Sequence, residues 1–410
     1  MGATADAQRI VVVGASLAGL RGAEAMRAAG FRGNITLVGA EPHFPPYDRP
    51  PLSKQVLTGQ LRPEKAQLRA EDDLGLELRL GQRADGLDLL RREVSVGGGA
   101  LPFDGLMIAT GVTPRPLPGP DAMRLAGVFT LRTLEDCLRL RERLAGAASV
   151  AVVGAGFIGC EVAASCRALG LRVTLIDALA APMERAIGRE LGTVLAGLHA
   201  RHGVRLRLAR PAAGLAGRDE VTGVLLADGE LVEADAVVVA LGAAPATGWL
   251  EGSGLWLADG LRCDQQCFAL RADGVAAAAV VAAGDVTRWE HPFLGSPIRV
   301  EHWTNAVGQA QAAGRNLAGA LRGQGEREAY ADVPYFWSDQ YDWKVQFAGV
   351  ARGAPVIEEG DPETGRFVAC YRAAGRLAGV LCVNWPARFS RYRRAVAEEW
   401  RAGPITSQRG

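Results

Sequence analysis

The sequence predicts an α/β protein with two dinucleotide-binding units of one plan and a separate α+β domain at its C-terminal end. An apolar strand, a glycine-rich turn, an alanine-rich helix and a second strand follow one another in residues 9–41, and the same order returns in residues 149–177. This order is typical of a parallel sheet that binds a nucleotide at its first turn. From Tyr330 onward the composition changes, because aromatic residues cluster. The internal repeat and this change predict three parts.

The composition excludes several classes of protein. The chain has 410 residues, 49% hydrophobic and 22% charged, which is ordinary for a globular protein of two or three domains. The net charge of +1 supplies no strong field for nucleic acid or an anionic membrane, and no apolar segment reaches the ~18 residues of a transmembrane helix. The seven cysteines are scattered and odd in number, which indicates reduced thiols and a cytoplasmic protein. The five histidines show no metal-ligand spacing, so we expect no metal site.

The first unit has an imperfect glycine turn. Its strand leads into Gly14-Ala-Ser-Leu-Ala-Gly19, where Ser16 stands at the position of the second glycine. Serine is small and its hydroxyl can donate to a phosphate, so the turn is compatible with a dinucleotide. Glu41 follows the second strand, Asn34–Val38. A carboxylate at this place can accept hydrogen bonds from both hydroxyls of an adenosine ribose.

The second unit carries the complete pattern G-x-G-x-x-G at Gly154, Gly156 and Gly159. The first glycine turns the chain, the second lets backbone amides approach a pyrophosphate, and the third lets the helix pack against the strand. The helix is expected over Cys160–Leu169, with its N-terminus facing the phosphates. Asp177 follows the next strand. It is placed to accept hydrogen bonds from the ribose of NADH and to repel the 2′-phosphate of NADPH.

Breaks in the pattern divide the chain further. The stretch Gly111–Pro120 is rich in proline and glycine, which predicts a linker. A helix is expected over Thr133–Leu144, and a second break in the pattern falls at Leu241–Pro245. An apolar strand then ends in Ala283-Gly-Asp285, and a helix is expected over Glu301–Leu321. An acid after such a strand and turn can hydrogen-bond a polyol such as the ribityl chain of a flavin.

Two dinucleotide sites and this acid together predict FAD and NAD(P)H as the cofactors. The breaks predict a discontinuous FAD-binding domain at residues 1–117 and 247–325, an NADH-binding domain at 118–246 and a C-terminal interface domain at 326–410.

Several short segments spread over nearly the whole chain form a recognisable set. They include Tyr47-Asp-Arg-Pro-Pro-Leu-Ser-Lys54, Ile108-Ala-Thr-Gly111, Glu301-His-Trp-Thr-Asn305 and Pro334-Tyr-Phe-Trp-Ser-Asp-Gln340. With these segments the chain resembles the NADH-dependent, FAD-containing ferredoxin reductases of bacterial oxygenase systems. The resemblance implies a glutathione reductase-like fold with two Rossmann-like domains. It also implies that electrons pass from NADH through FAD to a 2Fe-2S ferredoxin, which supplies a haem monooxygenase or an aromatic-ring dioxygenase. The ferredoxin would dock transiently and electrostatically on a monomer or weak dimer.

The resemblance also assigns residues to each cofactor. Residues at matching or motif positions for FAD are Gly14, Ser16, Ala18, Gly19, Glu41, Arg49, Lys54, Ala84, Thr110, Arg132, Asp285 and Trp303. Those for NADH are Gly154, Gly156, Phe157, Ile158, Gly159, Asp177, Arg185, Gly242 and Glu301. The sequence departs from the family pattern at Ser16 and at Pro45-Pro46, where one residue is added before Tyr47.

Three residues are candidates for the chemistry itself. Lys54 follows a Pro-Pro pair that restricts the backbone, and its cation would stabilise the electron-rich reduced flavin. Glu161 lies just past the second glycine turn and would compensate that charge, because a lone buried lysine is costly. Trp303 would form a flat wall beside the flavin and the nicotinamide.

Other functions on the same fold are less compatible with the sequence. A disulfide reductase or a peroxide-reducing oxidase needs a redox cysteine after the first unit, and no cysteine precedes Cys137. A flavoprotein with a mainly binding role, like apoptosis-inducing factor, is disfavoured by the near-neutral charge. A reductase for rubredoxin or another one-electron carrier stays open. The arginine-rich segment Trp385–Gly410 would steer an acidic ferredoxin to the protein.

Overall fold

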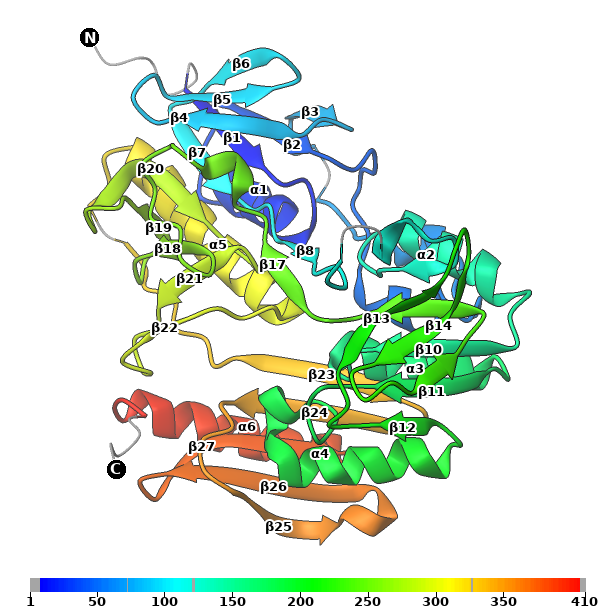
Figure 1. Ribbon diagram of the computed structural model, residues 1–410. Coiled ribbons are helices and arrows are strands. Elements are labelled where there is room, and N and C mark those ends of the chain that lie inside the picture. Colours follow the sequence, from blue (N-terminus) through cyan, green and yellow to red (C-terminus); the bar gives the residue numbers. More distant parts are fainter. Residues whose placement is uncertain (1–7, 72, 120–121, 326, 406–410) are drawn as a thin grey trace.

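The computed structural model describes residues 8–71, 73–119, 122–325 and 327–405. Figure 1 shows three parts: an upper part built from the blue, cyan and yellow segments, a green part at the lower right, and the orange and red C-terminal part below. The predicted α/β fold with two nucleotide-binding units and an α+β C-terminal domain is confirmed. Pro120 of the predicted linker and Arg409 of the arginine-rich segment lie outside the described residues.

A nine-stranded sheet forms the centre of the upper part, in the order β22-β21-β18-β19-β20-β7-β1-β2-β3. Its strands are β1 (Arg9–Val13), β2 (Asn34–Gly39), β3 (Leu76–Leu80), β7 (Gly105–Ile108), β18 (Leu261–Cys263), β19 (Phe268–Leu270), β20 (Ala276–Ala282), β21 (Thr287–Glu290) and β22 (Pro297–Ile298). The run from β20 to β3 is parallel. Residues 10–13 of β1 are all buried, which is typical of a parallel strand covered on both faces.

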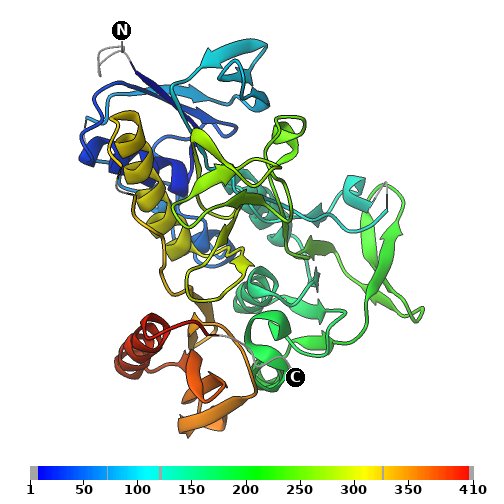
Figure 2. The ribbon, with the colours of Figure 1, turned by 90° about the vertical axis from the view of Figure 1, so that its left-hand side faces the viewer.

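Two helices from opposite ends of this part lie side by side on the sheet, α1 (Leu17–Ala28) and α5 (Trp303–Leu321) (Figure 2). Their close approach depends on small residues, since a Cβ on Gly314 would lie 2.6 Å from the carbonyl oxygen of Gly22. α5 begins at Trp303, two residues later than predicted, with His302 as its N-cap in an extended conformation. The upper part therefore needs the chain from both sides of the inserted second part.

The chain leaves and re-enters the upper part through a pair of short antiparallel strands, β8 (Val112–Pro114) and β17 (Ala243–Pro245). These strands fall within the two sequence breaks at Gly111–Pro120 and Leu241–Pro245. The crossing lies close to the boundaries predicted at 117 and 247, which stay predictions.

The second part repeats the plan on a five-stranded parallel sheet, in the order β12-β11-β10-β16-β9. Its strands are β9 (Val128–Phe129), β10 (Ser149–Val153), β11 (Arg172–Ile176), β12 (Arg205–Arg207) and β16 (Ala236–Val239), and its helices are α2 (Leu134–Leu144), α3 (Phe157–Ala168) and α4 (Glu184–Arg201). α2 has a capping box between Thr133 and Asp136. α3 begins at Phe157 and not at Cys160 as predicted, because the third glycine of the motif lies inside the first helical turn.

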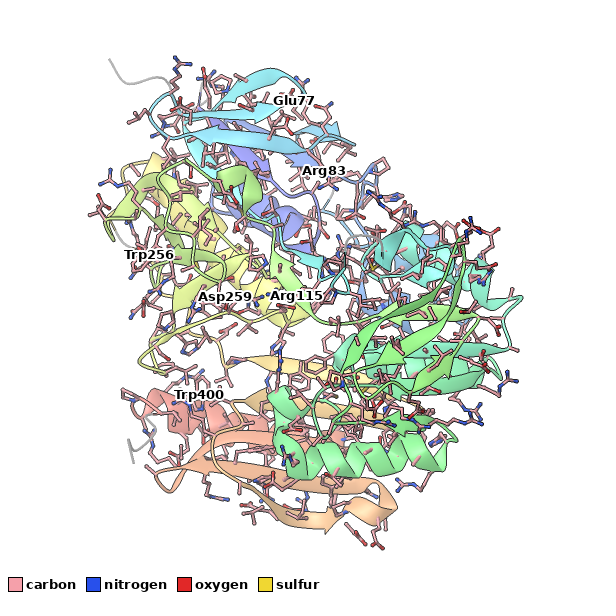
Figure 3. All side chains as sticks on the ribbon, in the orientation of Figure 1. Glu77, Arg83, Arg115, Trp256, Asp259 and Trp400 are labelled. Atoms are coloured by element: carbon pink, nitrogen blue, oxygen red, sulfur yellow. The ribbon has the colours of Figure 1, made fainter. Side chains whose placement is uncertain are left out.

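The C-terminal part is an antiparallel sheet in the order β23-β24-β27-β26-β25, covered by one helix. Its elements are β23 (Tyr335–Gln340), β24 (Trp343–Gly349), β25 (Pro355–Asp361), β26 (Arg366–Ala373), β27 (Arg376–Val383) and α6 (Pro386–Arg401). Trp400 of α6, labelled in Figure 3, is fully buried and packs edge-on against His291 of the upper part. One core cluster also joins Tyr47, Val150 and Phe336, so all three parts pack together.

Two small antiparallel sheets complete the fold. They consist of β4 (Ala84–Asp88), β5 (Glu93–Val96) and β6 (Gly99–Pro102), and of β13 (Ala212–Gly217), β14 (Val221–Leu226) and β15 (Leu231–Glu233). Within the described residues, no helix has the length and apolar character needed to cross a membrane.

Candidate functional site

A cavity of about 810 Å³ lies where the three parts meet. Its lining comes from the first glycine turn, from the start of α3, from β23 and from the segment that precedes α5. The predicted residues that line it are Ser16, Ala18, Arg49, Lys54, Thr110, Arg132, Phe157, Ile158, Glu161, Arg185, Asp285, Glu301 and Trp303. The predicted residues outside its lining are Gly14, Gly19, Glu41, Ala84, Gly154, Gly156, Gly159, Asp177 and Gly242.

The two glycine turns show why they need glycine. A Cβ on Gly14, at a φ of 119°, would lie 2.1 Å from the carbonyl oxygen of Ala109, and one on Gly19 would lie 1.8 Å from the carbonyl oxygen of Gly14. In the second turn, a Cβ on Gly159 would lie 1.8 Å from the carbonyl oxygen of Gly154. A Cβ on Gly156, in contrast, would meet no atom of the described residues within 4 Å. The space above this glycine is therefore open, where a bound pyrophosphate requires it.

The helices behind both turns begin without a side-chain cap. Neither Ser16 before α1 nor Gly156 before α3 supplies a capping hydrogen bond, and neither helix has an acid in its first turn. Helix N-termini carry unpaired N–H groups and the positive end of the helix dipole, so an uncapped start attracts an anion. Both turns thus fit a dinucleotide pyrophosphate.

Two guanidinium groups lie beside the first turn. Arg49 Nη1 donates to the carbonyl oxygen of Arg132 at 2.6 Å, and Arg49 Nη2 lies 2.7 Å from Glu41 Oε1. Burial and the neighbouring Arg49 lower the pKa of Arg132, whose Nη2 lies 3.3 Å from Asp285 Oδ2. Burial disfavours the charge on Arg49, yet the ion pair with Glu41 raises its pKa above the ordinary value. Two adjacent, partly buried cations fit a site for an anionic cofactor such as FAD.

Lys54 and Glu161, which the sequence analysis pairs, are in contact inside the cavity. Lys54 Nζ lies 3.1 Å from Glu161 Oε2, and their side chains are 11% and 7% exposed. Lys54 follows a short 3₁₀ helix, Pro50–Ser53. Ser53 Oγ donates to Glu161 Oε2 at 2.5 Å, and Ser338 Oγ donates to Glu161 Oε1 at 2.8 Å. The Glu161 carboxylate of the second part thus accepts hydrogen bonds from both the upper part and the C-terminal part.

Trp303 lines the cavity with its indole fixed. Its Nε1 donates to Asp48 Oδ1 at 2.8 Å, and its ring centroid lies 6.3 Å from that of Trp337. Trp337 lies 6.0 Å from the Tyr335 ring, and the Arg393 guanidinium of α6 lies over that ring at 4.7 Å. These aromatic rings also line a second cavity of about 470 Å³, next to Lys54.

The Asp177 carboxylate, expected to bind the ribose of NADH, also accepts hydrogen bonds from the backbone of its own unit. Its Oδ2 accepts from the backbone N–H of Ala155 at 2.5 Å and its Oδ1 from that of Leu179 at 2.7 Å. The side chain therefore closes its own glycine turn and keeps only its remaining lone pairs for a ligand. Two cations adjoin it through backbone hydrogen bonds, Arg207 and Arg210. Both are engaged by acids, Arg207 by Glu230 and Arg210 by Asp228 and Glu230.

The cysteines take no part in this cavity. All seven are unpaired and buried, and none lines it. Burial raises the pKa of Cys137 to about 11 and that of Cys166 to about 12, so these thiols are protonated and unreactive at neutral pH. Within the described residues, no group of three or more metal-ligating side chains occurs.

Sequence reasoning missed three residues that hydrogen-bond the side chains of Glu161 and Trp303, namely Asp48, Ser53 and Ser338. Asp48 and Ser53 lie within the segment Tyr47–Lys54 and Ser338 within Pro334–Gln340, so the family segments contained them. Their partners could not be read from the sequence, because Ser338 and Glu161 are 177 positions apart.

Comparison with known proteins agrees with this geometry. Residues 8–310 match the model of the family described as pyridine nucleotide-disulphide oxidoreductase, and residues 335–406 match that described as reductase C-terminal. The chain is 35% identical over 398 residues to the anthranilate 1,2-dioxygenase system ferredoxin–NAD(+) reductase component of Burkholderia cepacia, covering 96% of this chain and 95% of the relative. It is 36% identical to the rhodocoxin reductase of Rhodococcus erythropolis, covering 97% and 91%. The reductase in the crystal structure of the covalent putidaredoxin reductase-putidaredoxin complex is 30% identical, with a TM-score of 0.86 over 96% of this chain and 93% of that one.

The contacts of Asp285 predict that Asp285→Ala weakens flavin binding without unfolding the protein. The purified variant should bind FAD roughly tenfold to hundredfold more weakly, because a hydrogen bond to a charged group contributes about 1.5–3 kcal/mol. Flavin absorbance during dialysis measures this loss. Asp273→Ala, which alters an exposed turn away from the cavity, should keep its flavin. Loss of the whole fold in Asp285→Ala would instead show that the residue is structural.

The surroundings of Asp177 predict a preference for NADH. The kcat/KM for NADH should exceed that for NADPH by about a hundredfold, because like charges a few ångströms apart repel by up to roughly 4 kcal/mol before solvent screening. Asp177→Ala should lower the ratio of kcat/KM for NADH to kcat/KM for NADPH and leave the flavin content unchanged. The double variant Asp228→Asn/Glu230→Gln should lower the same ratio by raising kcat/KM for NADPH, because Arg207 and Arg210 lose their acidic partners. Equal use of both cofactors by the wild-type protein would contradict the assignment.

Proposed function

The chain belongs to the FAD-containing ferredoxin reductases of oxygenase systems, within the pyridine nucleotide-disulphide oxidoreductases, and on this premise we propose that it oxidises NADH and supplies single electrons to a 2Fe-2S ferredoxin. The ferredoxin would in turn supply a haem monooxygenase or an aromatic-ring dioxygenase. The observation that carries the proposal is one cavity that joins both glycine turns to the Lys54–Glu161 pair, with no cysteine in its lining. FAD held in this cavity would supply the chemistry that converts a two-electron hydride donor into a source of single electrons.

The residues around the first turn would hold FAD. The uncapped start of α1 and the guanidinium groups of Arg49 and Arg132 suit the pyrophosphate. Asp285 would accept from the ribityl hydroxyls, and Glu41 from those of the adenosine ribose. Ala84 lies on β4 outside the cavity lining, so its assignment rests on the resemblance alone.

The residues of the second part would hold NADH. Phe157 and Ile158 at the start of α3 and Arg185 at the start of α4 face the cavity, as does Glu301 before α5. We propose that the N-terminus of α3 binds the pyrophosphate and that Asp177 orients the adenosine ribose. The nicotinamide would then lie toward the Lys54–Glu161 pair.

Three side chains would serve the transfer itself. Lys54 Nζ presents a positive charge to the cavity, which favours the electron-rich form of the bound ring, and Glu161 balances this charge when the ring is oxidised. Trp303, held by Asp48, would fix one wall and exclude water from the place of transfer.

The second cavity supports the exit of electrons toward a docked carrier. Trp303, Trp337 and Tyr335 connect the main cavity to it. Arg393 brings α6 to the same place, although Arg388 and Arg391 are partly neutralised by Glu359. We propose that an acidic ferredoxin docks over this region. We also assign the protein to the cytoplasm, on the ground of its seven unpaired cysteines.

The proposal predicts ferredoxin-dependent one-electron output. With NADH as donor, cytochrome c should be reduced on the order of tenfold faster or more when a 2Fe-2S ferredoxin is added, and this gain should fall with added salt because the docking is electrostatic. Stopped-flow or steady-state absorbance of cytochrome c measures the rate. A rubredoxin that replaces the ferredoxin with equal efficiency, or no gain with any carrier, would contradict the proposal.

The buried thiols predict that electron transfer needs no cysteine. Iodoacetamide under native conditions should leave NADH-to-ferricyanide turnover unchanged, because burial keeps the thiols protonated. The same reagent in denaturant should modify all seven, which mass spectrometry can count. Rapid loss of turnover together with modification of the native protein would indicate a thiol on the electron path.

A further inference from the structure

A chain of hydrogen bonds leads from Glu161 into the C-terminal part. Ser338 Oγ lies 2.8 Å from Glu161 Oε1, and Gln340 Nε2 lies 3.1 Å from Ser338 Oγ. The Gln340 Oε1 atom lies 3.1 Å from His199 Nε2, and His199 Nδ1 lies 3.0 Å from Tyr341 Oη. Ser338, Gln340 and His199 have no exposed surface. The chain thus joins α3, β23 and α4 through buried polar atoms.

The carboxylate fixes the direction of every hydrogen bond in this chain. Glu161 can only accept, so the Ser338 hydroxyl donates to it and must accept from the Gln340 amide nitrogen. The Gln340 oxygen then faces His199 and requires a proton on Nε2. A neutral imidazole with this proton accepts at Nδ1, so the Tyr341 hydroxyl donates there. All donors therefore point toward Glu161, and no other arrangement pairs each of them.

The surroundings of His199 agree with a neutral ring. Burial lowers the pKa of His199 to about 4, and the groups that face the ring are Gln340, Tyr341 and the neighbouring His202. Gln340 cannot turn freely either, since its Nε2 also lies 3.5 Å from Met183 Sδ. The orientation of the amide is thus held on both sides.

We propose that His199, Gln340 and Ser338 are positioning residues, which together hold the Glu161 carboxylate against Lys54 and so set how readily the bound flavin is reduced. This inference rests on the proposed function only in that the cavity holds a flavin. His199 contacts neither the cavity nor Lys54, and it acts three hydrogen bonds away from Glu161. If its Nε2–H is lost, the Gln340 oxygen has no donor and turns to the Ser338 hydroxyl, which then leaves Glu161.

The test compares His199→Phe with His199→Gln. In His199→Phe, Glu161 loses one donor and its negative charge is less compensated, so the electron-rich reduced flavin is disfavoured. We expect the reduction equilibrium to shift about tenfold toward the oxidised form, which corresponds to about 30 mV for a two-electron couple. His199→Gln, whose Nε2 can occupy the place of the imidazole Nε2, should restore the wild-type potential. The midpoint potential of the flavin is measured by dye-coupled titration, and its reduction by NADH by stopped flow.

A matched control separates positioning from stability. His291 is a second buried histidine, bonded to the backbone oxygen of Asp332 and absent from the cavity lining. His291→Phe should lower the melting temperature and leave the potential within error of wild type. Should His199→Phe fail to fold, Ser338→Ala replaces it, because it removes the donor to Glu161 directly.

The proposal is overturned if a folded, flavin-containing His199→Phe, or Ser338→Ala in its place, keeps the wild-type potential and reduction rate. It is also overturned if His199→Gln and His199→Phe shift the potential equally. These measurements need no ferredoxin. A protein whose flavin behaves as expected but reduces no ferredoxin would therefore contradict the proposed function alone.

Discussion

The arrangement of the three parts depends on one buried ion pair, that of Lys54 with Glu161. Taking two charges out of water is costly, and removing one partner of such a pair typically destabilises a protein by about 3–5 kcal/mol. The free-energy cost of burying this pair is offset here because Glu161 also accepts hydrogen bonds from Ser53 and Ser338. These donors come from the upper and C-terminal parts, while Glu161 belongs to α3 of the second part. Satisfying a single carboxylate thus fixes where the three parts meet, and the cavity forms at that point.

A second constraint acts on the two ends of the cavity. In both glycine turns the third glycine packs against the carbonyl oxygen of the first, at a distance that excludes any side chain. The helix behind each turn is therefore drawn close to its strand, and its N–H groups converge on one place. Because both sheets present their turns to the same cavity, two dinucleotides could approach it from opposite parts of one chain. Ser16 replaces the second glycine of the motif in the first turn, and it also lines this cavity.

The chemistry of the site differs from what the family name suggests. The name refers to disulphides, but the cavity of this chain contains no thiol, and burial holds the cysteines in their protonated form. Under the proposed function, electrons would leave through the surface near Trp303 and Trp337. The second cavity and the Arg393–Tyr335 contact adjoin these rings, so the C-terminal part would lie at the proposed exit. The same part supplies Ser338 and Gln340, so in our proposals it would act both on the charge near the flavin and on the docking of the carrier.

The repeated plan can be predicted from the amino-acid sequence, because strand, glycine turn, helix and terminal acid are local features with a fixed order along the chain. The sequence also determined the absence of an early redox cysteine, and the family segments determined most of the cavity-lining residues. Element ends were less certain: α3 begins at Phe157 because Gly159 is compatible with a first helical turn. The folded structure was needed to show that Asp177 closes its own turn and that Arg207 and Arg210 form ion pairs with acids. The same holds for the hydrogen-bond chain from His199 to Glu161. Two of its bonds join residues more than a hundred positions apart, and they depend on how separate sheets pack, which no local sequence pattern encodes.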